Sequence, residues 1–119
     1  NEKKSVNFSI VYGRATLLYS LLEALGDRVP ARRWEPLLKS TLQPSIIMPP
    51  TPLWRMLNQA VTEVKLAETV LLSMLMLGEF GPTQVNPIVL RQVIISLRRV
   101  GLHSDARALA LEAAVAAGL

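Results

Sequence analysis

The final stretch of the chain, GLHSDARALALEAAVAAGL at residues 101–119, decides the fold. Alanine and leucine are strong helix formers and fill most of it, and Ser104 stands where an N-cap belongs. From Ser104 onward, only Asp105, Arg107 and Glu112 are charged. The stretch therefore predicts a terminal helix that is apolar on most sides, and a helix of that kind is buried on most sides.

The rest of the chain has the same helical periodicity. Apolar residues recur at intervals of three and four almost throughout, and no stretch has the strict alternation of a half-buried strand. We predict an all-α domain of four to six helices, either stacked antiparallel helical hairpins (a short α-solenoid) or a compact helical bundle. Because the chain has 119 residues, 50% of them hydrophobic, residues 1–119 are predicted to form a single domain with one core.

A hairpin and a linker are predicted in the first half. Residues 9–42 are predicted to form the hairpin, whose first helix, 9–25, ends at Gly26 in a left-handed conformation. The second helix is predicted to be short and irregular, because Pro36 removes a hydrogen bond and clashes with the preceding turn. Residues 43–52, QPSIIMPPTP, contain four prolines, which predict an extended linker.

Residues 52–79 leave two arrangements open. An apolar stripe runs through them without a breaker, which favours one long helix. A weak internal repeat favours a hairpin instead: Gly26 and Gly101, each followed five residues later by alanine, lie 75 residues apart, which places the turn of a middle unit near Val64. The predicted stripe comprises Leu53, Leu57, Val61, Val64, Ala67, Leu71, Met74 and Gly78.

Residues 87–118 are predicted to form the last hairpin. Its first helix opens with Asn86 as a cap before Pro87, and Gly101 ends it. Thr51 precedes a proline in the same way and is predicted to cap the middle segment. The core face of the first helix of the last hairpin is predicted to consist of Leu90, Val93, Ile94, Leu97 and Val100.

The last hairpin, VGLHSDARALALEAAVAAG, resembles the second half of a tetratricopeptide unit. Gly101, Ala106, Ala110 and Ala113 fall where that family has small residues at its turn and helix crossing. The chain departs from the family at Ile94, where a small residue is usual, and its repeat interval is longer than the family's roughly 34 residues. The resemblance covers about a sixth of the chain. It implies a stack of antiparallel helices whose grooves bind peptides or other proteins.

The terminal helix has more apolar circumference than one neighbour covers. The face predicted to meet the preceding helix consists of Ala106, Leu109, Ala110, Ala113 and Ala117. Leu111, Val115 and Leu119 lie on another side, where burial of each is worth about 1.5–3 kcal/mol. We therefore predict a non-catalytic protein–protein interaction or oligomerisation module, which docks a second copy or a different protein through its C-terminal hairpin. The predicted interface residues are Leu111, Val115, Leu119, Ile95, Arg91, Arg98 and Trp54.

The burial of the last helix and of Trp54 can each be explained in two ways. The last helix is either an intermolecular face or the central helix of a compact bundle. Trp54 is either an interface anchor or a rim residue that shields the core.

Catalytic and cofactor-binding residues are not predicted. The chain has no cysteine, and its one histidine, His103, lacks a partner at metal-ligand spacing. Its acidic residues are scattered, and Gly78 and Gly81 lack the lysine and hydroxyl residue of a phosphate-binding loop. We therefore predict no enzyme activity, metal, cofactor or small-molecule substrate.

Nucleic-acid association is the competing function. The formal net charge is +4, and Arg32 and Arg33 stand beside a tryptophan, a pattern suited to phosphate contact and base stacking. However, Arg91 and Arg98 share a helical face with Ile95, which indicates an edge that faces protein. The first alternative is therefore a weakly basic nucleic-acid-associated helical domain, and the second is an accessory domain of a larger enzyme.

The most hydrophobic run, VLLSMLML at 70–77, is predicted to be core, because it is far shorter than the roughly 20 residues of a membrane-spanning helix. The chain begins NEKKSV, with neither an initiator methionine nor a signal-peptide pattern. We therefore expect a fragment or a processed chain. The lack of cysteine is compatible with the cytoplasm, where we expect it to reside.

Overall fold

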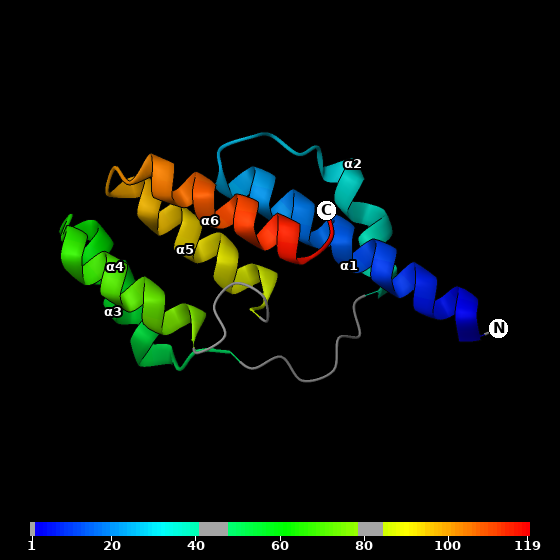
Figure 1. The fold of residues 1–119 in the computed structure, drawn as a ribbon, viewed down its shortest axis with the longest axis horizontal. Coiled ribbons are helices and arrows are strands. Elements are labelled where there is room, and N and C mark those ends of the chain that lie inside the picture. Colours follow the sequence, from blue (N-terminus) through cyan, green and yellow to red (C-terminus); the bar gives the residue numbers. More distant parts are fainter. Residues whose placement is uncertain (1, 41–47, 79–84) are drawn as a thin grey trace.

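The computed structural model describes residues 2–40, 48–78 and 85–119, and within these ranges the chain forms helices and no strand (Figure 1). The helices are α1 (Glu2–Ala24), α2 (Ala31–Trp34), the 3-10 helix η1 (Glu35–Ser40), α3 (Thr51–Thr62), α4 (Leu66–Leu77), α5 (Pro87–Arg99) and α6 (His103–Ala116). The prediction of an all-α bundle is confirmed. The predicted linker 43–52 and the end of the predicted hairpin 9–42 lie partly outside the described residues.

The central helix of the bundle is α5. It packs against α1, α4 and α6 and also touches α3. Figure 1 shows it between α1 and α6 on one side and the α3–α4 hairpin on the other. Its predicted core face is confirmed, since all five of these residues are buried: Leu90, Val93, Ile94, Leu97 and Val100. The compact-bundle alternative predicted that the last helix is central; in the structure the central helix is α5.

The first hairpin follows the predicted pattern with a longer first helix. α1 begins at Glu2, earlier than the predicted start at residue 9. Gly26 ends it with φ of 98°, the left-handed conformation expected there. The predicted short, irregular element is a single α turn, α2, followed by the 3-10 helix η1, which contains Pro36.

One of three predicted helix caps forms. The Asn86 side chain accepts a hydrogen bond of 2.9 Å from the backbone N–H of Ile88, as predicted. The Thr51 prediction is wrong, because α3 begins at Thr51 itself with Pro50 in the cap position. The Ser104 prediction is also wrong. α6 begins at His103, with Leu102 in the cap position, two residues before Ser104, and without a side-chain cap bond.

Residues 51–77 form a helical hairpin, and the long-helix alternative does not occur. The chain reverses at Glu63, Val64 and Lys65, where the N–H of Lys65 donates to the carbonyl of Ala60 at 2.9 Å. Val64 has φ of 54°, a left-handed conformation that β-branched residues rarely adopt. The turn therefore forms without the glycine or proline that usually marks such a reversal in the sequence.

This turn makes the predicted stripe wrong beyond Val61. Leu57 and Val61 are buried as predicted, but the next four residues of the stripe, Val64, Ala67, Leu71 and Met74, are exposed. The reason is that a break in the helix resets the direction in which each later side chain points. The residues of α4 that pack inward are Thr69, Leu72, Ser73 and Met76.

Candidate interaction surfaces

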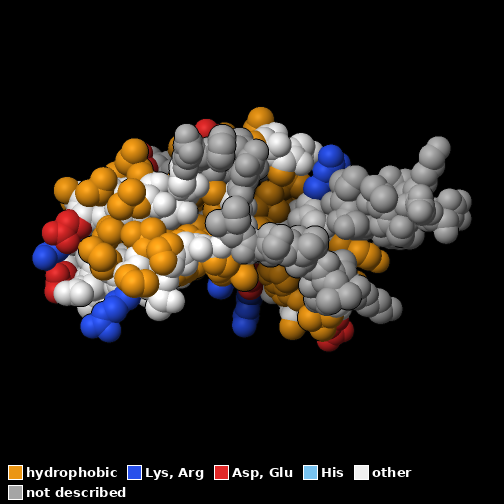
Figure 2. Space-filling view, turned by 90° about the horizontal axis from the view of Figure 1, so that it is seen from below, with side chains coloured by type: hydrophobic (Ala, Val, Ile, Leu, Met, Phe, Trp, Pro, Cys, Tyr) orange, Lys and Arg blue, Asp and Glu red, His pale blue; other side chains and the backbone are white. Residues whose placement is uncertain are grey.

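The outer side of α4 is an apolar surface. We call it the α4 face and define it as Leu66, Ala67, Val70, Leu71, Met74 and Leu75. Its five large side chains are between 38% and 63% exposed, and the only charged residue within α4 is Glu68. Apolar side chains also gather at the α3–α4 end of the molecule in the space-filling view (Figure 2). The prediction that residues 70–77 are core is therefore wrong for Val70, Leu71, Met74 and Leu75.

The distribution of residues around α4 is the reverse of the usual one. Two of its four buried residues, Thr69 and Ser73, carry hydroxyl groups, whereas its outer side is almost entirely apolar. The Thr69 hydroxyl donates to the carbonyl of Lys65 at 2.6 Å. The buried Ser73 Oγ has no hydrogen-bond partner among the described residues. The helix thus buries both of its serine and threonine hydroxyls and leaves most of its large apolar side chains in contact with solvent.

The α4 face is large for a chain of this size. From the exposed fractions of its side chains, it presents on the order of 500 Å² of apolar surface. The largest patch on a typical monomer is roughly 300–600 Å² and is often functional. The α4 face falls within that class, since it is a single continuous surface along three turns of one helix.

The outer side of α6 is a second exposed apolar surface, which we call the α6 face and define as Leu111, Val115 and Leu119. Leu111 and Val115 are 65% and 68% exposed, and Leu119 is also exposed. α6 packs on α5 and α1 through its buried alanines, which are Ala106, Ala110 and Ala113. The three apolar residues predicted to lie on another side from these alanines are thus accessible.

The other predicted interface residues lie elsewhere. Arg98 Nη1 donates to the carbonyl of Ala24 at 2.9 Å, so this guanidinium holds the end of α1. Ile95 packs half-buried against the core, and Arg91 is exposed on the same helix. Arg98 and Ile95 therefore make contacts within the fold.

Trp54 is separated from the α6 face. It lies on α3, which packs on α4 and α5, whereas α6 packs on α5 and α1. Its ring is half-buried against the core, and its Nε1 donates to the carbonyl of Pro49 at 3.0 Å. These contacts match the core-rim interpretation of Trp54.

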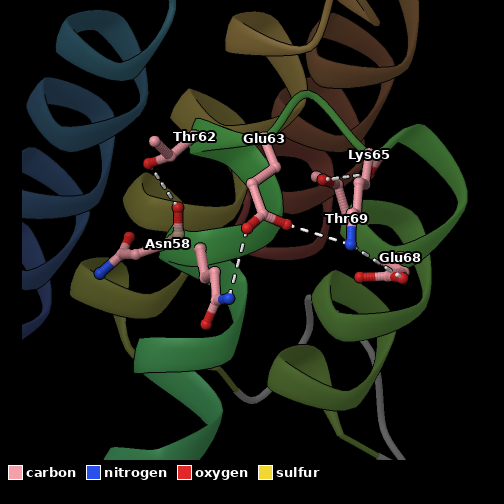
Figure 3. A network of polar contacts seen from close by, with 7 residues as sticks. Asn58, Thr62, Glu63, Lys65, Glu68 and Thr69 are labelled. Atoms are coloured by element: carbon pink, nitrogen blue, oxygen red, sulfur yellow. Dashed lines mark hydrogen bonds and ion pairs between the residues drawn. The ribbon is translucent and has the colours of Figure 1, made fainter.

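A charged cluster borders the N-terminal end of the α4 face (Figure 3). Lys65 Nζ lies 3.0 Å from a carboxylate oxygen of Glu63 and 3.8 Å from one of Glu68. The hydrogen bond from Lys65 lowers the pKa of the Glu63 carboxyl, with further lowering by a hydrogen bond from Gln59 and by the charge of Lys65. The bond to Glu63 and the two nearby carboxylates raise the pKa of the Lys65 ammonium.

Two hydroxyl groups complete this cluster from the flanking helices. Thr62 Oγ1 donates to the carbonyl of Asn58 at 2.9 Å on α3, and Thr69 makes the bond to Lys65 described above on α4. Each is a bond from a side chain to the carbonyl four residues earlier, which satisfies the hydroxyl within its own helix. The cluster thus links the turn to the start of α4 by exposed ion pairs, and the lowered pKa of the Glu63 carboxyl is opposite to that of a general acid.

The described residues contain neither a metal-binding cluster nor a membrane-spanning helix. Within residues 2–40, 48–78 and 85–119, no three His, Cys, Asp or Glu side chains gather in a way that could hold a metal ion. His103 is exposed at the first position of α6. Over the same part of the chain, no helix combines the length and the apolar character needed to cross a bilayer.

No protein-family model matches the chain, and no curated protein and no solved structure matches it significantly. The candidate surfaces therefore rest on the chain's own geometry. Of these, the α4 face was missed from sequence. The signal that marks it is the spacing of Thr69 and Ser73, which puts these two hydroxyl residues on one side of α4 and the five large residues of the α4 face on the opposite side.

Proposed function

We propose that this chain is a non-catalytic protein-interaction or oligomerisation module that docks through exposed apolar helix faces. The α6 face belongs to the C-terminal hairpin, and the α4 face adds a larger surface. The observation that carries the proposal is the exposure of five large apolar side chains along α4. Exposure of these side chains to water is unfavourable. A partner that covers them contributes about 25 cal/mol of binding free energy for each Å² of apolar surface buried.

The packing of α6 supports docking at the C-terminal hairpin. The fully buried residues of its inward side are alanines, with the half-buried Leu109 beside them, so the helix packs on α5 mainly through small side chains. Leu111 and Val115 are then left on the outside, with Glu112 as the charged residue between them. An apolar ridge bounded by charge is typical of helix-on-helix recognition.

Site-specific photo-crosslinking tests this function. A photoreactive phenylalanine analogue is placed at Met74 on the α4 face, at Leu111 on the α6 face and, as a control, at the exposed Arg33 on α2. In cells that make the protein, we expect discrete adducts at Met74 or Leu111 that exceed those at Arg33. Equal or absent adducts at all three positions would contradict an interaction module.

In the nucleic-acid alternative, Arg32 and Arg33 would contact phosphates, and both are exposed on α2. Arg98 is less suited to phosphate contact than the sequence alone indicates, because its guanidinium donates a hydrogen bond to the carbonyl of Ala24. A titration with random-sequence DNA at low salt tests this alternative, since phosphate-driven binding is strongest there. Lack of affinity under those conditions removes it.

A further inference from the structure

The α4 face is self-complementary when the helix direction is reversed. Its members are spaced symmetrically about a point between Val70 and Leu71. Placed antiparallel on a second copy of itself, α4 brings Ala67 opposite Met74 twice at the middle of the face and puts Val70 and Leu71 of both copies beside the axis. The smallest side chain thus meets the longest, which lets two helices pack closely. A two-fold interface requires this property, because one patch must fit itself.

The area of the face reaches what a dimer needs. If both faces are covered completely, two copies of a face of about 500 Å² bury at most roughly 1,000 Å² in total, the lower limit for a specific interface. Ala67 adds to the five large side chains, and the half-buried Leu77 lies at the end of the same helix. An interface of this size is at the weak end of the range, so the dimer population depends on concentration.

Charge favours the antiparallel arrangement. Glu68 is the only charged residue within α4, and Lys65 precedes the helix. A parallel pair would put the two Glu68 carboxylates at the same level, whereas the antiparallel pair separates them by about 7 Å along the axis. It also places Lys65 near the C-terminal end of the partner's α4, where a cation is stabilised by the helix dipole.

We propose that the α4 face binds the α4 face of a second copy of this chain in an antiparallel, two-fold symmetric dimer, with the axis passing between Val70 and Leu71. This inference rests on the proposed function and names the occupant of one of its surfaces. Burial of Leu71 and Met74 in such a dimer explains why α4 carries its apolar residues outward.

Sedimentation velocity of the 119-residue chain is the first test. As concentration rises from micromolar to submillimolar, we expect the mass to rise from 13.1 kDa toward twice that value. Leu71→Lys and Met74→Lys each weaken the dimer by about a hundredfold, because an ammonium group enters the interface twice. The matched control is Leu111→Lys, which adds the same charge at a similarly exposed site on α6 and leaves dimerisation within about twofold.

Cysteine mapping is the second test, and it remains decisive if a lysine variant fails to fold. The natural chain has no cysteine, so single cysteines report one position each. Leu71→Cys lies beside the axis and forms a disulfide-linked dimer on mild oxidation. Leu66→Cys alone does not, because its twin lies about 13 Å away along the axis. A mixture of Ala67→Cys and Met74→Cys chains does form the linked dimer, because these two positions face each other at the middle of the α4 face.

The outcomes separate this inference from the proposed function. A wild-type chain that stays at 13.1 kDa throughout overturns the dimer, as does a dimer broken by Leu111→Lys but unaffected by Leu71→Lys. Self-linking of Leu66→Cys as readily as Leu71→Cys overturns the antiparallel arrangement. A photo-adduct at Met74 whose mass differs from two chains shows another occupant, which overturns the inference while the interaction module stands.

Discussion

The contact between Arg98 and the end of α1 predicts that Arg98 stabilises the fold and is not available to a partner. Arg98 Nη1 donates to the Ala24 carbonyl at 2.9 Å, and its guanidinium lies against Gly26. A Cβ added at Gly26 would stand 2.8 Å from Arg98 Nη2, too close for any real contact. Gly26→Ala therefore has two effects: it strains a backbone with φ of 98°, and it displaces the guanidinium.

The magnitudes follow from these two effects. The left-handed conformation costs alanine about 1–2 kcal/mol relative to glycine. A charge-assisted hydrogen bond is worth about 1.5–3 kcal/mol, but Arg98 is only half-buried, so water reduces the loss to about 1 kcal/mol. Gly26→Ala should thus destabilise the wild-type chain by about 2–3 kcal/mol. In an Arg98→Met background, where the bond is already lost, it should cost only the backbone strain, about 1–2 kcal/mol.

A double-mutant cycle measures this difference. Urea unfolding of the wild type, Gly26→Ala, Arg98→Met and the double variant, followed by circular dichroism at low protein concentration, gives four free energies of unfolding. We expect a coupling energy of about 1 kcal/mol between the two positions. If Gly26→Ala costs the same in both backgrounds, the guanidinium does not occupy this place, and Arg98 returns to the residues available for a partner.

Three further predictions concern α4, α6 and the turn between α3 and α4. Ser73→Ala removes a buried hydroxyl without a partner among the described residues, so the free energy of unfolding by urea should rise by about 1 kcal/mol; a fall would indicate a bond at this hydroxyl. The double variant Leu111→Lys, Val115→Lys should keep its helix content and melting temperature, because both side chains are exposed, and a collapsed fold would contradict the α6 face. The pair of Glu63 and Lys65 should stabilise the fold between the ordinary pKa values of the two groups. This contribution should fade as pH falls through the lowered pKa of Glu63 or rises through the raised pKa of Lys65, and a difference in urea midpoint between wild type and Glu63→Gln that does not change with pH would refute it.

The features that could be predicted from sequence are those with local causes. Gly26 and Gly101 both adopt the positive φ expected of glycines that end helices. Asn86 caps α5 through a bond that spans only two residues. The core face of α5 was predicted correctly because a helix packed on several sides must bury every apolar position of its stripe.

The turn at Val64 could not be predicted with the same certainty, because its cause lies in tertiary packing. The repeat interval pointed to this position, but the residues around it favour continued helix, and neither glycine nor proline interrupts them. The α3–α4 hairpin forms because both helices pack on each other and on α5. The side of α4 that faces solvent depends on this turn. A stripe that continues as helix through Val64 therefore predicts the α4 face to be buried, whereas the structure exposes it.

The choice between α6 and α4 as the principal docking surface also has a physical reason. From sequence, residues 70–77 are predicted to be core, which leaves α6, with three charged residues on a largely alanine surface, as the predicted docking helix. Alanine exposes little area, however, and docking free energy follows the apolar area removed from water. On that measure α4 exceeds α6, because α4 exposes five large apolar side chains, whereas the large apolar residues that the α6 helix exposes are Leu111 and Val115. Exposed apolar area at the helix surface, which depends on where the α3–α4 turn falls, is therefore the quantity that ranks α4 above α6 as a candidate docking surface.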